Sequence, residues 1–325
     1  MADDEEEMTY AGAGVDIDES EAAVEALAGA VAGLGDTTEY AGLVDIGEQY
    51  LGLATDGVGT KLLVAEALSD YSTIGIDCMA MNVNDLVASG VEPVAFVDYL
   101  AVDEPDDSMT EEIGAGLAAA AEAAGVALVG GETAVLPEVI DGFDLAGTAA
   151  GLASEDDLFD GEAEVGDTIV GFPSSGIHSN GLTLARQAAT ESHAYTDPFP
   201  GEEAASIGEV LLEPTRLYTY LLDDLRSLET HAAAHVTGGG WTNLSRMGSF
   251  RYEITDPFDA QPVFEFVQEA GNVSNEEMHR TFNMGTGFVA ALPEGDAESL
   301  VEATDGELIG RVEAGDSVAV RGLEL

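Results

Sequence analysis

The sequence contains very few basic residues. Nine lysine and arginine side chains accompany 64 aspartates and glutamates, and the formal net charge is −55 over 325 residues. A chain this negative repels phosphate backbones and anionic lipid surfaces, so we expect no nucleic-acid partner and no membrane partner. With Cys78 as its single cysteine it can form no intrachain disulfide, and no apolar run approaches the roughly 20 residues that span a bilayer. These absences predict a cytoplasmic protein.

The acidic residues are spread along the whole chain. An acidic interaction tail would concentrate its charge in one block. At molar salt the Debye length falls to about 3 Å, and self-repulsion of this size becomes tolerable. The spread therefore favours adaptation of the surface to a salt-rich, halophilic cytoplasm, and an acidic surface for a basic partner is the alternative.

The composition supports a folded, two-domain protein. Hydrophobic residues make up 46% of the chain, enough for a packed core, and the length suits two domains of ordinary size. An acidic stretch at 154–166 separates two similar halves, so we predict domains at 1–160 and 161–325. Helices are predicted at 20–34, 77–89, 110–124, 182–190, 213–228, 263–270 and 275–282. Strands are predicted at 50–55, 93–102, 127–130, 143–152, 168–172, 287–292, 308–312 and 317–323. This mixture, without a regular βα repeat, favours an α+β fold over a doubly wound sheet.

A glycine-rich segment, Thr-Asp-Gly-Val-Gly-Thr-Lys at 55–61, follows a predicted strand. Glycines let backbone N–H groups approach a phosphate, and a lysine adds a positive charge. The spacing is not that of a Walker A loop, and a plain tight turn is the alternative. Because Lys61 is the only lysine of the chain, we favour a phosphate-binding role for this segment.

A second segment, at 77–87, places Asp77, Asn84 and Asp85 on one side of a largely apolar helix. Carboxylates on such a helix are costly unless they are paired or bind a cation. Oxygen ligands suit Mg²⁺, and Asp56 lies in the neighbouring turn. The pattern therefore predicts a magnesium site, with an N-cap role for Asp77 and a solvated Asp85 as the alternative.

Three further segments offer polar groups at turns. Glu132 stands at a strand end, where its carboxylate either points into a site or lies in an exposed turn. The segment 174–181 opens a predicted helix and includes His178, which is a candidate for phosphate binding or proton transfer, although a lone histidine in a turn is usually just solvated. The segment 237–240 is a candidate anion cradle or a flexible loop. Arg186, Arg216 and Arg280 lie near these motifs as candidate partners for an anion.

Taken together, these segments resemble the aminoimidazole ribonucleotide synthetase family, the phosphoribosylformylglycinamidine cyclo-ligases of purine biosynthesis. The resemblance covers nearly the whole chain in the family's order, which is far more specific than any single motif. The matching segments are 13–17, 55–61, 75–86, 131–134, 174–181, 212–216, 235–240 and 269–287.

The resemblance implies a two-domain ATP-binding fold, in a homodimer whose N-terminal sheets pair across the interface. It implies that ATP phosphorylates the amide oxygen of formylglycinamidine ribonucleotide. The amidine nitrogen then attacks, phosphate leaves, and 5-aminoimidazole ribonucleotide forms. A small-molecule kinase of the same fold, similar to thiamine-phosphate kinase, is the second hypothesis, and a non-catalytic acidic binding protein is the third.

The resemblance also implies roles for individual residues. Catalytic roles would fall to Asp56, Lys61 and His178. ATP would contact Gly14, Asp16, Gly57, Gly59, Thr60, Asn84, Asp98 and Glu132. The nucleotide substrate would contact Ser179, Asn180, Thr237, Gly238, Gly239 and Gly240. Mg²⁺ would be held by Asp56, Asp77 and Asp85, with K⁺ as a further candidate ion. The chain departs from the family pattern at Ala11, where the family often has lysine, and at Val135, where it usually has glutamate.

Overall fold

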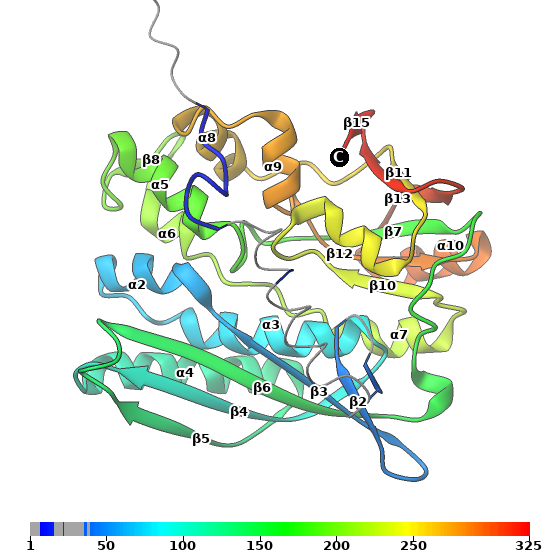
Figure 1. The fold of residues 1–325 in the computed structure, drawn as a ribbon, viewed down its shortest axis with the longest axis horizontal. Helices are drawn as coiled ribbons and strands as arrows, with labels where there is room; N and C mark the ends of the chain where they lie inside the picture. Colours follow the sequence, from blue (N-terminus) through cyan, green and yellow to red (C-terminus); the bar gives the residue numbers. More distant parts are fainter. Residues whose placement is uncertain (1–6, 16–21, 23–35, 38–39) are drawn as a thin grey trace, which may run out of the picture.

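The computed structural model describes residues 7–15, 22, 36–37 and 40–325, so the predicted helix at 20–34 and Asp16 lie outside the described residues. Within this part the chain forms two large sheets with helices packed around them (Figure 1). The predicted α+β class is confirmed.

The N-terminal sheet has six strands in the order β1-β2-β3-β6-β4-β5. Their bounds are β1 Asp36–Thr37, β2 Gly42–Asp45, β3 Tyr50–Gly57, β4 Glu92–Val102, β5 Ala127–Val135 and β6 Phe143–Ala153. β4 and β5 are parallel and are joined by α4 (Asp107–Ala124), as parallel neighbours require a crossover. Asp106 caps α4 by accepting hydrogen bonds from the N–H groups of Ser108 and Met109, and Gly125 ends it with a left-handed φ of 71°.

Helix α3 (Ile74–Ala88) lies at the centre of the molecule (Figure 1). It packs against strands β3, β4 and β6 on one side and against β10 of the C-terminal sheet on the other. Nearly all of its residues are buried, as expected for a helix that is apolar around its circumference. Every polar side chain on this helix therefore needs a partner within the protein.

The C-terminal sheet has seven strands in the order β10-β12-β7-β13-β11-β14-β15. Their bounds are β7 Thr168–Pro173, β10 Ala232–His235, β11 Arg251–Ile254, β12 Thr286–Leu292, β13 Glu307–Glu313, β14 Ser317–Val320 and β15 Leu323–Glu324. A two-stranded ribbon is formed by β8 (Pro198–Phe199) and β9 (Glu202–Ser206). The helices are α2 Leu62–Leu68, α5 Leu182–Ser192, α6 Ile207–Leu211, α7 Leu222–Ser227, α8 Pro262–Ala270, α9 Asn275–Thr281 and α10 Glu294–Ala303. Short 3₁₀ turns are η1 Gly59–Lys61, η2 Glu155–Asp157, η3 Thr219–Leu221 and η4 Gly240–Met247.

The two halves share a hydrophobic core. One buried cluster joins Val58 and Leu62 of the N-terminal half to Ile177 and Leu182 of the C-terminal half. The segment between the two sheets, 154–167, contains the predicted domain boundary at 160/161.

The predicted helix at 213–228 is wrong in its first half. Residues 213–218 have no helical structure, and helix follows only at η3 and α7. Pro214 disfavours a helical conformation at Glu213, a signal already present in the sequence. Strands β2, β10 and β11 and helices α2 and α10 were not predicted, because each is short or lacks a clear period.

The described residues include no helix that combines the length and the apolar character needed to cross a bilayer. Acidic side chains instead line exposed faces, as with Glu294, Glu298 and Glu302 along α10. Like charges at this i,i+4 spacing repel one another.

We expect the unfolding temperature to rise as KCl increases from about 0.1 M to about 2 M, because the Debye length shortens from about 10 Å to about 3 Å. Thermal unfolding followed by circular dichroism measures this effect. Glu298→Lys should stabilise the protein at low salt by about 0.3–0.5 kcal/mol and have little effect at high salt. An unfolding temperature independent of KCl would contradict the halophilic interpretation.

Candidate active site

Lys61 and Asp77 form a buried ion pair between η1 and α3. The Lys61 Nζ lies 2.9 Å from Oδ1 and 2.8 Å from Oδ2 of Asp77, and both side chains are fully buried. Nζ also donates a hydrogen bond of 2.6 Å to the carbonyl oxygen of Glu213. Burial lowers the pKa of Lys61, and the carboxylate of Asp77 opposes that shift.

The same face of α3 holds the extended segment 213–218. Asp77 Oδ1 accepts hydrogen bonds from the N–H and the hydroxyl of Thr215, at 2.7 and 2.6 Å. About two turns further along α3, Asn84 donates a hydrogen bond to the carbonyl of Arg216 at 2.9 Å and accepts one from the N–H of Tyr218 at 2.8 Å. These side-chain bonds replace the backbone bonds that a helix would supply, and they bind the two halves of the molecule together.

This arrangement places three of the predicted site residues away from solvent. Lys61, Asp77 and Asn84 are fully buried. Lys61 and Asp77 bind one another, and Asp77 and Asn84 also hydrogen-bond to the segment 213–218. The geometry therefore does not support contact of Lys61 or Asn84 with ATP, or metal ligation by Asp77. Among the described residues, no group of three or more Asp, Glu, His or Cys side chains is arranged to hold a metal ion.

Asp56 and Asp85 are the predicted metal ligands that lie near solvent. Asp56 is solvent-accessible, yet the surrounding protein removes enough water to raise the pKa of its carboxyl to about 6, with the negative charge of Asp85 contributing. The N–H of Gly57 donates to Asp56 at 2.7 Å and opposes this shift, as does the nearby charge of Arg246. Two carboxylates that repel one another favour the binding of a cation.

His235, at the end of β10, orients Asp85. Its Nδ1 lies 3.0 Å from Asp85 Oδ1, and its ring is fully buried. The two backbone bonds of Asn84 fix its amide so that Nδ2, 3.4 Å from His235 Nε2, is the donor. Nε2 then accepts, and Nδ1–H donates to Asp85. Sequence reasoning did not assign a role to His235, although it begins the matched segment 235–240.

Two glycine turns offer open backbone. Gly59 and Gly14 have left-handed φ values of 72° and 109°, and a Cβ added at either would meet nothing within 4 Å. The first turn is held to α5 by a 3.0 Å contact between the hydroxyls of Thr60 and Thr183. The second is held by the N–H of Tyr10, which donates to Glu277 at 2.6 Å. The predicted phosphate-binding turn and the turn of Gly14, a predicted ATP contact, thus both contact the C-terminal half.

Asp98 and Glu132 lie on opposite faces of the N-terminal sheet. Asp98 lies two residues after buried Phe96 in β4, so both side chains are on the face that the helices cover. It also lies over Gly131, where a Cβ would be 2.3 Å from its Oδ1. Glu132 pairs in register with exposed Tyr99 and lies on the outer face. The structure does not bring these two predicted ATP contacts together.

His178 is buried rather than solvated. It has a left-handed φ of 64°, its Nε2 accepts a 3.2 Å hydrogen bond from the N–H of Ser175, and only 1% of the residue is exposed. Burial lowers its pKa well below the usual range, so the ring is neutral near pH 7. The geometry supports a role in shaping the turn more than the predicted catalytic role.

The two predicted substrate segments do meet. A Cβ at Gly238 would be 3.6 Å from the Oδ1 of Asn180, and Ser179 accepts a 3.4 Å hydrogen bond from Thr215. Asn243 shapes the second segment by accepting from the N–H of Thr237 at 2.7 Å. Gly239 (φ 98°) has Asn243 close by, and Gly240 serves packing, because a Cβ there would lie 2.3 Å from the carbonyl of His279.

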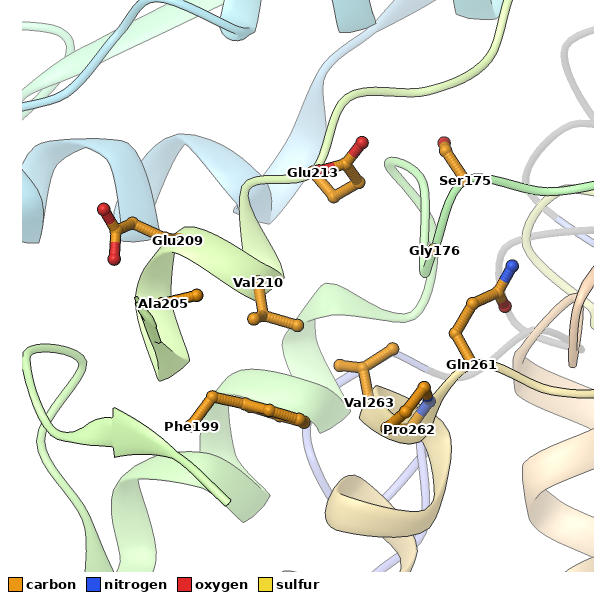
Figure 2. A pocket seen from close by; sticks show the side chains of 10 residues that line it. All are labelled: Ser175, Gly176, Phe199, Ala205, Glu209, Val210, Glu213, Gln261, Pro262 and Val263. Carbon is orange, nitrogen blue, oxygen red and sulfur yellow. The ribbon is translucent and has the colours of Figure 1, made fainter. Parts of the chain in front are cut away.

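A separate cavity of about 370 Å³ is lined in part by Ser175 and Gly176 of the segment 174–181 (Figure 2). Its lining combines apolar side chains with polar ones, which include the carboxylates of Glu209 and Glu213. The lining residues are Ser175, Gly176, Phe199, Ala205, Glu209, Val210, Glu213, Gln261, Pro262 and Val263. None of the predicted ATP or substrate contacts lines it.

Two family descriptions match the chain in succession. "AIR synthase related protein, N-terminal domain" matches residues 38–153, and the corresponding C-terminal domain matches residues 164–322. The two sheets are thus those of an AIR synthase related protein.

Curated relatives narrow this class. The chain is 46% identical to the phosphoribosylformylglycinamidine cyclo-ligase of Methanococcoides burtonii over 332 residues, 99% of each chain. It is 48% identical to that of Methanosarcina mazei, over 95% of this chain and 96% of the relative. It is 44% identical to that of Pyrococcus furiosus, over 91% of each. The chain belongs to the phosphoribosylformylglycinamidine cyclo-ligase family, which confirms the predicted resemblance.

Solved structures share the fold at lower identity. A thiamine monophosphate kinase from Aquifex aeolicus has a TM-score of 0.68 at 17% identity, with 96% of this chain and 99% of that chain covered. The hydrogenase maturation protein HypE in complex with ATP has a TM-score of 0.61 at 18% identity, with 85% and 83% covered. At these sequence identities the comparison shows a common fold and nothing about activity.

We expect Lys61→Ala to lower the free energy of unfolding by about 3–5 kcal/mol, because it leaves the Asp77 carboxylate buried without its partner. Lys61→Met combined with Asp77→Leu should recover part of this loss. Arg280→Ala, which breaks an exposed pair with Glu276, is the control and should cost no more than about 0.5 kcal/mol. Urea unfolding measures all three. A stable Lys61→Ala protein that had lost affinity for ATP would instead assign the ammonium to the phosphates.

Proposed function

We propose that this protein catalyses the ATP-dependent cyclisation of formylglycinamidine ribonucleotide to 5-aminoimidazole ribonucleotide, releasing ADP and phosphate. The observation that carries this proposal is the 46–48% identity to phosphoribosylformylglycinamidine cyclo-ligases over 95% or more of the chain. The activity belongs to purine biosynthesis, and we expect it in the cytoplasm.

The site favours phosphoryl transfer by positioning and charge neutralisation, which is what this chemistry needs. The open backbone at Gly14 and Gly59 suits the phosphates of ATP, because N–H groups can approach them without side chains in the way. Asn180 and Gly238 lie side by side where the two predicted substrate segments meet, and they would orient the ribonucleotide.

Asp56 and Asp85 fit a magnesium ion that is shared with ATP. Mg²⁺ in proteins is commonly held by one or two carboxylates together with phosphate oxygens and water, and these are the two carboxylates whose charges oppose one another here. The ion would supply charge neutralisation for the transferred phosphoryl group. His235 holds the Asp85 carboxylate in place for this role. K⁺ is a second candidate for an ion that binds beside ATP.

A small-molecule kinase is the second candidate, because the thiamine monophosphate kinase fold covers almost the whole chain. Its 17% identity supports a common fold only, against 46–48% for the cyclo-ligases. Release of free phosphate distinguishes a cyclo-ligase from a kinase, which leaves the phosphate on its product.

We expect the purified protein in concentrated KCl to convert formylglycinamidine ribonucleotide and Mg·ATP into aminoimidazole ribonucleotide, ADP and free phosphate. Asp56→Asn should reduce turnover by at least about a hundredfold with little loss of stability, because a neutral amide is a poor Mg²⁺ ligand. Asp223→Asn, at an exposed position of α7, is the matched control. A phosphorylated product without free phosphate would favour the kinase, and an active Asp56→Asn protein would remove Asp56 from the mechanism.

We further propose that the protein is a homodimer joined through its N-terminal sheets. Helices α3 and α4 cover one face of the sheet, and the other face exposes Val44, Leu53, Val97 and Tyr99 at 40–48%. Strand β5 is an edge strand whose residues are almost all exposed, and it includes Val129 at 63% exposure. An apolar face beside an unpaired edge suits a second copy of the same chain.

We expect the wild-type protein to have twice the mass of the 33.5 kDa chain in light scattering. Val97→Glu combined with Tyr99→Glu should give a folded monomer at the same concentration, because charges on a buried apolar interface are costly. Leu308→Glu, at an exposed position of the C-terminal sheet, should leave the mass unchanged. A monomeric wild-type protein would contradict the proposal.

A further inference from the structure

Among the residues that the structure describes, Arg186 is a cation without a partner. The chain has one lysine and eight arginines. Lys61 and six of the arginines form ion pairs. Arg246 lies over the ring of Tyr40, 5.0 Å from its centroid. Arg186 alone makes no ion pair, hydrogen bond or cation–π contact with the residues that the structure describes, and its Nε is buried.

An unpaired arginine is unexpected in this chain. With 64 acidic residues available, an ion pair would be easy to form at almost any position. A buried N–H donor without an acceptor is also unfavourable, since folding has removed its water and supplied nothing in return. Both facts indicate a guanidinium that is kept free for an acceptor outside the protein chain.

The position of Arg186 on α5 identifies where that acceptor would lie. Thr183, three residues before Arg186, lies on the same face of the helix, and Gln187 is its neighbour in the sequence. Thr183 contacts the hydroxyl of Thr60 in the first glycine turn at 3.0 Å. Gln187 donates a 2.8 Å hydrogen bond to the carbonyl of Ala13 in the second glycine turn. Arg186 therefore lies on α5 beside the two residues that contact the two turns.

The turns themselves leave room for an anion. Gly59 and Gly14 have open space where a side chain would be, so a ligand can reach their backbone. Guanidinium groups bind phosphate oxygens with two parallel hydrogen bonds, which suits a triphosphate between two such turns. The lysine of the first turn is committed to Asp77 and is not available for this purpose.

We propose that Arg186 binds the triphosphate of ATP, and that it supplies the positive charge that the sequence suggests for Lys61. This inference rests on the proposed function, because it takes ATP as the nucleotide. It assigns to α5, an element of the C-terminal half, a direct contact with a nucleotide whose other contacts are the two glycine turns.

The test measures binding of ATP, inorganic tripolyphosphate and adenosine to the full-length protein by calorimetry in the presence of Mg²⁺. Arg186→Ala should raise the dissociation constants for ATP and tripolyphosphate by about tenfold to a hundredfold, the usual effect of losing hydrogen bonds to a charged group. Adenosine binding should not change. Arg186→Lys should recover part of the loss by restoring the charge, and Arg186→Gln should recover less.

Arg311→Ala, which removes the same charge from an exposed pair with Glu313, is the matched control and should bind ATP as the wild type does. The unfolding temperature of ligand-free Arg186→Ala should stay within about a degree of the wild type or rise, because a buried unpaired donor is removed. Unchanged ATP affinity in Arg186→Ala would overturn the inference and leave the proposed function intact. A large fall in stability that Arg186→Lys does not reverse would make the residue structural and also overturn it. A wild-type protein that does not bind ATP would overturn both.

Discussion

The buried ion pair of Lys61 and Asp77 constrains the rest of the structure. Two charges removed from water are tolerated only when each is fully satisfied, and here the surplus hydrogen bonds go to Glu213 and Thr215 of the other half. The pair thereby fixes the first glycine turn to α3 and α3 to the extended segment 213–218. Together with the bonds of Asn84 and the shared hydrophobic core, the pair holds the two halves against one another.

Much of the fold follows from local sequence. Residues 77–89 predict α3 within a few positions, because apolar residues surround the helix and Gly90 follows it. The strands at 93–102 and 143–152 agree with β4 and β6 to within one residue at each end. The extended conformation of the segment 213–218 was not predicted, because it is set by side chains of α3 that lie more than 130 residues away in the chain. Such contacts leave no local period in the sequence.

A sequence indicates open backbone at glycines more readily than it indicates the partners of charged residues. Gly59, a predicted ATP contact, has nothing within 4 Å of an added Cβ, and the role of a glycine depends on the side chain that it lacks. The roles of charged residues are harder to predict, since a residue's type does not reveal its partner in the fold. Lys61 beside a glycine turn suggests phosphate, whereas the structure pairs it with Asp77. Asp85 acquires its orientation from His235, 150 residues away, which no spacing rule connects to it.

The burial of Lys61 has a chemical consequence for the folded protein. It carries the only side-chain primary amine of the chain, and that amine is fully buried within an ion pair. Reagents that acylate or alkylate lysine need a free, solvated amine, so they find no lysine to modify on the native surface. The same amine becomes reactive once the two halves separate. Lysine labelling of this protein is therefore a direct chemical record of how often the contact between its two halves opens.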